Sequence, residues 1–163
     1  MFLVEKSPAF LYNNGSFIDI NTEDIIMANV KELLKAEENG SLSFGDYSLT
    51  QKTKLDEFSF EGDVYKVKTF QEITRLEKNG GVVYESVPGS AVHGYKETER
   101  QITFETEAVD DLQITLEVEP EKEYKVFVND TNIGKLKSSL GGKISFSIEL
   151  DAGETAKVQV VKL

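Results

Sequence analysis

The chain has 163 residues, of which 29 are acidic and 18 are basic, and its formal net charge is −11 at pH 7. This charge repels nucleic-acid phosphates and anionic lipid surfaces and argues against both as partners. Cysteine is absent, which excludes disulfide bonds, thiolate metal sites and cysteine nucleophiles. No cofactor is expected.

The first 17 residues are rich in aromatic side chains. These are Phe2, Phe10, Tyr12 and Phe17. Asn14-Gly15 is typical of a type I′ turn, so we expect this segment to form a hairpin, or alternatively to dock on a neighbouring subunit. The apolar run before Glu5 is too short for a secretory signal or a membrane span, so we expect a cytoplasmic protein without a membrane partner.

Two segments of the N-terminal half have helical signals. Residues 22–38 begin with an N-capping Thr22 and end at Asn39-Gly40, a typical helix C-terminus. Residues 63–70 predict a strand, and residues 70–78 predict a second helix, which again ends at Asn-Gly. LLKAEENGSLSF (33–44) matches ITRLEKNGGVVY (73–84) in character, which suggests one helix, cap and strand unit used twice.

From Gln101 onward the pattern alternates with a period of two. Five short segments, ITFETEA, LQITLEV, EYKVFVN, KISFSIEL and TAKVQVV, are separated by turn residues. We expect Phe104, Ile114, Leu116 and Val118 to face a core and the intervening acidic and polar residues to face water. The fold class expected is therefore α+β and mainly β: residues 1–97 form a helix-plus-strand region, and residues 98–163 form a small antiparallel, immunoglobulin-like β-sandwich.

Several motifs resemble those of a small uncharacterised bacterial family. They are Glu38-Asn39-Gly40, residues 63–80, VYESVPG at 83–89, EYKVFVND at 123–130, Gly141-Gly142 and Ala152-Gly153-Glu154. Some members of that family carry the label "endosialidase". Sialidases as a family hold the sugar carboxylate with a cluster of about three arginines. This chain has only Arg75 and Arg100, so sialidase activity is not expected.

The segment YESVPGSAVHGY (84–95) contains the single histidine of the chain. A serine hydrolase would use Ser90 as nucleophile, His93 as base and either Glu85 or Glu97 as the orienting carboxylate. The segment lacks the G-x-S-x-G pattern of a nucleophile elbow, and Pro88-Gly89 is typical of a turn. We therefore favour a connecting loop, with a small hydrolase as an alternative.

Turn-like acidic pairs offer a second possible chemistry. Asp110, Asp111 and Asp130 could supply oxygen ligands to calcium, although none lies in an EF-hand spacing. All three fall where hairpin turns are expected, and the turn interpretation is favoured.

The absence of a convergent catalytic set favours a non-catalytic protein. We expect a binding or assembly protein that acts through protein–protein contacts, with a partner or with a second copy of itself. A glycan-binding module is an alternative, because KISFSIELDAGETAKVQVV is similar to the closing strands of immunoglobulin-like accessory domains on polysaccharide-processing enzymes.

Overall fold

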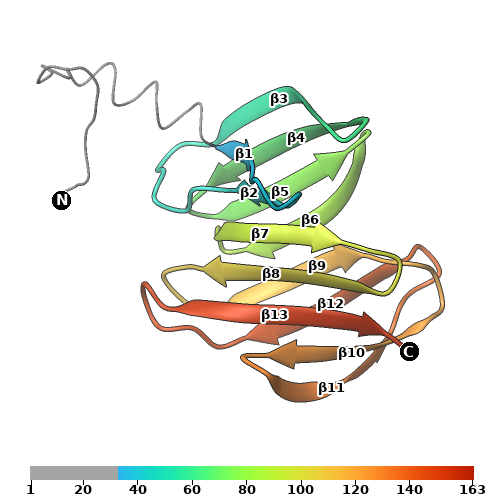
Figure 1. The fold of residues 1–163 in the computed structure, drawn as a ribbon. Helices are drawn as coiled ribbons and strands as arrows, with labels where there is room; N and C mark the ends of the chain where they lie inside the picture. Colours follow the sequence, from blue (N-terminus) through green and yellow to red (C-terminus); the bar gives the residue numbers. More distant parts are fainter. Residues whose placement is uncertain (1–32) are drawn as a thin grey trace, which may run out of the picture. The chain divides into compact units, whose positions relative to one another are not determined.

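The computed structural model describes residues 33–163, which form one compact unit, Leu33–Leu163 (Figure 1). These residues are all β-structure. The strands are β1 (Leu34–Ala36), β2 (Leu42–Phe44), β3 (Thr53–Phe60), β4 (Asp63–Phe70), β5 (Ile73–Lys78), β6 (Gly81–Val87), β7 (Ala91–Glu97), β8 (Gln101–Glu107), β9 (Leu112–Glu117), β10 (Glu123–Val128), β11 (Thr131–Lys137), β12 (Lys143–Ile148) and β13 (Thr155–Lys162). The described part of the chain contains no helix that could cross a membrane.

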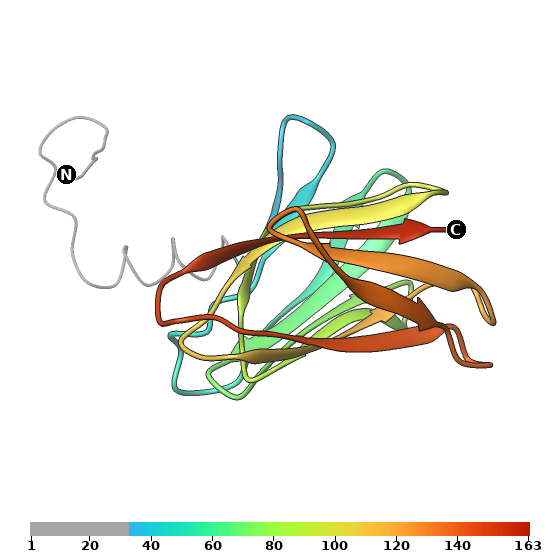
Figure 2. The ribbon, with the colours of Figure 1, turned by 90° about the horizontal axis from the view of Figure 1, so that it is seen from below.

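The strands form two antiparallel sheets. The larger has seven strands in the order β1-β2-β7-β8-β13-β10-β11, and the smaller has six in the order β12-β9-β6-β5-β4-β3. Figure 2 shows the two layers and the tip of the β1–β2 hairpin, which projects away from them. The inward faces of both sheets share one hydrophobic core, so the fold is sandwich-like.

An aromatic cluster occupies the centre of this core. The ring of Tyr84 makes edge-on contacts with Phe44, Tyr95 and Phe104 at centroid distances of 5.2, 6.4 and 5.6 Å. Edge-to-face pairs of this kind add about 0.5–1.5 kcal/mol beyond the burial of the rings. Phe104, Ile114 and Leu116 are buried as expected, and Glu105 and Glu117 on the same strands are exposed.

The expected α+β fold is wrong, because residues 33–163 contain no helix. The second expected helix is β5, in which Thr74 and Leu76 are buried and alternate with the more exposed Arg75 and Glu77. The Asn-Gly that was expected to cap this helix is the β5–β6 turn, with φ of 50° at Asn79 and 88° at Gly80. A helix C-cap and a type I′ hairpin both need positive φ, so the dipeptide alone does not distinguish them.

The first expected helix, residues 22–38, is also wrong over the part that the structure describes, residues 33–38, and for a similar reason. Its last residues belong to β1 and to the β1–β2 turn, where Gly40 has φ of 82°. The match between residues 33–44 and 73–84 thus corresponds to two β-hairpins, whereas a helix, cap and strand was expected. Residues 22–32 of that helix and the expected N-terminal hairpin lie outside the described residues.

The sheets also combine strands from both sides of residue 97. β7 pairs with β8 and β6 pairs with β9, so β9, β12 and the other C-terminal strands do not form a separate sandwich. The segment expected to be a connecting loop supplies most of β6 and β7, joined by a tight turn at residues 88–90.

Candidate functional site

Ser90 lies in a buried chain of hydroxyl groups next to the β6–β7 turn. Its Oγ is 2.9 Å from the Tyr84 hydroxyl and 2.6 Å from Ser86 Oγ, and Ser86 Oγ donates to the Pro88 carbonyl at 3.0 Å. Because each hydroxyl has one proton to donate, the chain has one direction: Tyr84 donates to Ser90, Ser90 to Ser86, and Ser86 to Pro88. The hydroxyl proton of Ser90 is therefore donated to Ser86 within the core.

The backbone of Ser90 is held just as firmly. Thr74 Oγ1 donates to the Ser90 carbonyl at 2.8 Å and accepts from the Ser90 amide at 3.0 Å, and Thr69 Oγ1 lies 2.8 Å from Thr74 Oγ1. A Cβ placed on the preceding Gly89 would lie 1.9 Å from the Phe70 carbonyl oxygen, so only glycine fits there. This end of the sandwich is closed, and its buried hydroxyls are structural.

The hydrolase candidates Glu85 and His93 have separate partners. Glu85 forms an ion pair with Arg75 on the neighbouring strand, with Oε2 2.8 Å from Nε and 2.6 Å from Nη2. His93 is about half exposed, and its Nε2 lies 3.1 Å from Glu107 Oε1, whose other oxygen accepts from the Tyr47 hydroxyl. Ser90, His93 and Glu85 share no hydrogen bond, so the structure shows no nucleophile–base pair among them.

His93 lines a shallow groove on the outer face of the seven-stranded sheet, beside the β1–β2 hairpin. The groove has a volume of about 760 Å³. Ser43 Oγ donates to Glu37 Oε2 at 2.5 Å on one side of it, and Glu105 and Lys157 lie on the other. Its one aromatic lining residue, Phe104, is 3% exposed, so this groove has no aromatic surface on which a sugar ring could stack.

The candidate calcium ligands serve the turns in which they lie. Asp110 Oδ1 accepts from the Asp111 amide at 2.8 Å, and Asp111 Oδ1 accepts from the Leu150 amide at 2.8 Å. Asp130, with φ of 67°, is 3.1 Å from Lys157 Nζ. Within residues 33–163 no three acidic or histidine side chains gather in a way that could hold a metal ion.

The sheet edges differ in how they are protected against further pairing. β1 has only three residues. β3 contains a register irregularity and several charged side chains, and the pairing of β11 with β10 is also irregular, with Lys135 and Lys137 on β11. Short length, bulges and lysines are the usual devices that prevent edge-to-edge association. β12 has none of them over residues 144–148, and it pairs with β9 in unbroken register.

A groove of mixed polarity lies between the edges β11 and β12. Its volume is about 550 Å³. Its apolar lining residues are Val126, Val128, Ile133, Leu136, Phe146 and Ile148, and its polar ones are Lys135, Ser145, Ser147 and Glu149. Ile133 is 46% exposed, which leaves part of this lining in contact with solvent.

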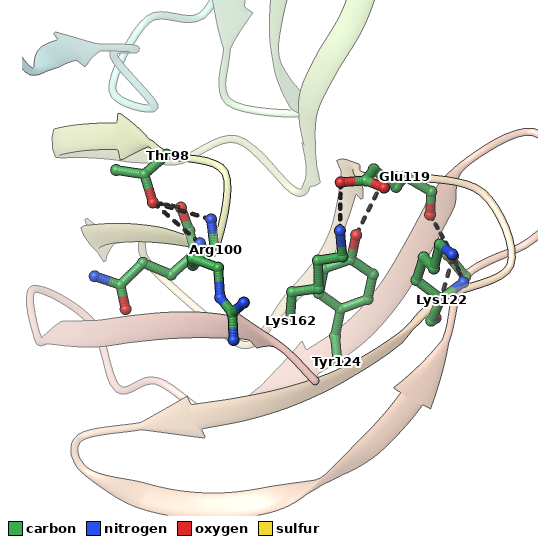
Figure 3. A network of polar contacts seen from close by, with 8 residues as sticks. Thr98, Arg100, Glu119, Lys122, Tyr124 and Lys162 are labelled. Carbon is green, nitrogen blue, oxygen red and sulfur yellow. Dashed lines mark hydrogen bonds and ion pairs between the residues drawn. The ribbon is translucent and has the colours of Figure 1, made fainter.

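The end of the fold at which β7 and β9 finish carries two acidic side chains, Glu97 and Glu119, whose pKa values shift in opposite directions. Figure 3 shows the turns that meet there: Glu119 Oε2 accepts from Lys162 Nζ at 2.7 Å, and the Tyr124 hydroxyl accepts from the Glu119 amide. The hydrogen bond and charge of Lys162 lower the pKa of Glu119. Glu97 is exposed as a residue, but crowding of its carboxyl by protein atoms raises its pKa; Lys78 opposes that rise and Glu117 adds to it.

Sequence reasoning missed the β12 edge and the position of Tyr95. The stretch ISFSI is free of charge, proline and glycine, which is a readable signal of an unprotected edge. Tyr95 follows Gly94, whose φ of 69° accompanies a register irregularity between His93 and Lys96. The bulge turns Tyr95 into the core, and a glycine within a strand pattern is the signal for it.

Comparison with protein-family models, with curated proteins and with solved structures gives no match for this chain. The resemblance to a family with members labelled "endosialidase" therefore stays a prediction.

Proposed function

We propose that this chain is a non-catalytic assembly protein that associates with a second copy of itself through the free edge of β12. The observation that carries the proposal is the unprotected edge over residues 144–148, beside the partly apolar groove between β11 and β12. An added strand would satisfy the free backbone groups of β12 and cover the apolar lining of the groove.

The sequence of β12 is complementary to itself when two copies run antiparallel. A register centred on Phe146 places Lys143 opposite Glu149, Ile144 opposite Ile148 and Ser145 opposite Ser147. Opposite charges, apolar pairs and hydroxyl pairs each stabilise directly opposed positions of antiparallel strands. This local complementarity offsets the long-range repulsion between two chains of charge −11.

The proposal is tested by measuring the molar mass of the full chain by size-exclusion chromatography with light scattering. We expect a weak dimer, with a Kd on the order of micromolar, because one pair of six-residue strands and a small groove lie at the low end of specific interfaces. Ser145→Lys, which introduces a charge on the edge, should give a monomer. Ser59→Lys, an exposed position on the bulged edge β3, is the matched control and should remain dimeric.

Charge exchange supplies an independent check. Glu149→Lys should raise the Kd of the dimer by about threefold to tenfold, because it places a lysine at position 149 opposite Lys143 of the other copy. Adding Lys143→Glu should restore the opposite charges and the original Kd. Deletion of residues 1–17 removes the aromatic segment and leaves β12 unchanged. The dimer should remain, because β12 and not the aromatic segment is proposed to form it. A full chain that stays monomeric at high concentration, or a dimer lost only on deletion of the aromatic segment, would show the proposal to be incorrect.

A further inference from the structure

A third cavity, of about 630 Å³, lies at the ends of β6 and β7 away from their connecting turn. Both sheets contribute to it: Tyr65 and Lys78 come from the six-stranded sheet, and Tyr95 and Glu97 come from β7 of the seven-stranded sheet. It shares no lining residue with the groove beside β12. Ligand binding in this cavity is therefore independent of the proposed self-association.

The wall of this cavity contains a buried polar group without a partner. Tyr95 is 5% exposed, and its hydroxyl has no hydrogen-bond partner among the residues that the structure describes. An unsatisfied buried hydroxyl costs about 1–3 kcal/mol, so a partner that completes its hydrogen bond would recover that free energy. A ligand that reaches Tyr95 would supply the missing bond.

Two further rings add to the apolar part of the cavity. Phe60 and Tyr65 line it as a tilted pair with centroids 6.2 Å apart. Aromatic faces attract cations through their quadrupole, most strongly where water is partly excluded.

The charged side chains around the cavity leave an excess of negative charge. Lys78 lies 3.6 Å from Asp63, and Lys96 donates to the Asn39 carbonyl at 3.2 Å. Glu61, Glu97 and Glu99 also line the cavity, and none of them forms an ion pair within residues 33–163. Burial of its carboxyl raises the pKa of Glu97, and the charge of Lys78 offsets that rise only in part.

We propose that this cavity binds an alkylammonium or guanidinium group, carried either by a small amine or by a lysine or arginine side chain of a peptide. The cationic nitrogen donates to the Tyr95 hydroxyl oxygen and to the Glu97 carboxylate, and its aliphatic stem packs against Phe60 and Tyr65. Sugars and anions are the competing ligand classes: a sugar could use the rings and the hydroxyl but gains nothing from net negative charge.

The test is a titration of the full ¹⁵N-labelled chain by heteronuclear NMR with n-butylammonium, and separately with sodium butyrate, glucose and an acetylated, amidated Gly-Lys-Gly peptide. We expect saturable shifts of the Tyr95 and Glu97 amides with butylammonium, and weaker or no shifts with butyrate and glucose. A lower Kd for the peptide than for the free amine would identify a protein-borne side chain as the source, and the reverse order would identify a small amine.

Three variants make the result specific. Glu97→Gln and Tyr95→Phe should each raise the Kd for butylammonium by about tenfold, since each removes one contact to a charged donor. Glu105→Gln removes the same charge from the outer face of the seven-stranded sheet and should leave the Kd unchanged. Thermal unfolding of each variant shows that the fold is retained. Absence of saturable shifts, equal binding of glucose, or an unchanged Kd in both Glu97→Gln and Tyr95→Phe would overturn the proposal.

Discussion

Two tyrosines in the same core, Tyr84 and Tyr95, differ in whether their hydroxyl groups have a hydrogen-bond partner. Their rings are 6.4 Å apart, both are nearly inaccessible to solvent, and burial raises the pKa of both hydroxyls. Tyr84 starts a hydroxyl chain that ends on a backbone carbonyl, whereas the hydroxyl of Tyr95 has no partner within residues 33–163. A satisfied buried hydroxyl stabilises the closed end of the sandwich, whereas the hydroxyl of Tyr95 is a buried polar group that the core leaves unpaired.

The largest effect should come from filling the closed end. Gly89→Ala would place a methyl group 1.9 Å from the Phe70 carbonyl oxygen, so we expect a loss of at least about 3 kcal/mol in the free energy of unfolding. Gly81→Ala is the control, because the nearest atom to its Cβ lies 3.8 Å away and its φ is not in the left-handed region. Urea denaturation of both variants measures the difference, and equal losses would show that the turn is not tightly packed.

A smaller change in the free energy of unfolding is expected when the hydroxyl group of Tyr84 or of Tyr95 is removed. Tyr84→Phe should lower the free energy of unfolding by about 1 kcal/mol, because it removes one buried hydrogen bond to Ser90. Tyr95→Phe should leave that free energy unchanged or raise it by up to about 1 kcal/mol, because it removes a hydroxyl without a partner. Denaturation under identical conditions checks the order, and a larger loss for Tyr95→Phe would refute the contrast.

The smallest effect is a dependence on pH at the acidic end. The pKa of Glu97 is raised in the folded chain, so folding favours its protonated form and the stability it contributes is lost as the pH rises through that pKa. Glu97→Gln should therefore gain stability relative to the wild type as the pH rises above about 4.

Glu119 provides the opposite case at the same end. Its pKa is lowered by Lys162, so its contribution is present above the unfolded pKa and is lost as the pH falls. Glu119→Gln should be less stable than the wild type at pH 7, and the difference should shrink as the pH falls below about 4. Urea denaturation from pH 3 to 8 tests both variants, and parallel pH profiles for the two would contradict the assignment.

Much of the C-terminal part of the sheet arrangement was readable from the chain. The period of two across residues 101–161 predicted β8, β9, β10, β12 and β13, and it assigned Phe104 and Ile114 to the core. β11 was missed because Thr131–Lys137 is exposed along its length except for a half-buried Leu136, and it contains Gly134. A strand that buries little has little periodic signal.

The helical expectations failed where local signals had two meanings. The segment ITRLEK has residues with good helix propensity and ends in Asn-Gly, yet strand pairing with β4 and β6 outweighs that propensity. The hydrolase hypothesis rested on the closeness of Ser90 and His93 in sequence. In an extended segment an odd separation directs side chains to opposite faces, and Ser90 is indeed in the core whereas His93 is on the outer surface.

The sequence by itself determined the quantities that depend on composition and short-range periodicity: the acidic charge, the absence of thiol chemistry and the alternating strands of the C-terminal part. Only the tertiary structure decided which strand edges stay unpaired, which hydroxyls find partners and which carboxylates gather at one end. These properties depend on contacts between residues far apart in the chain, such as β7 with β2 and β9 with β6, and no local pattern encodes such pairings.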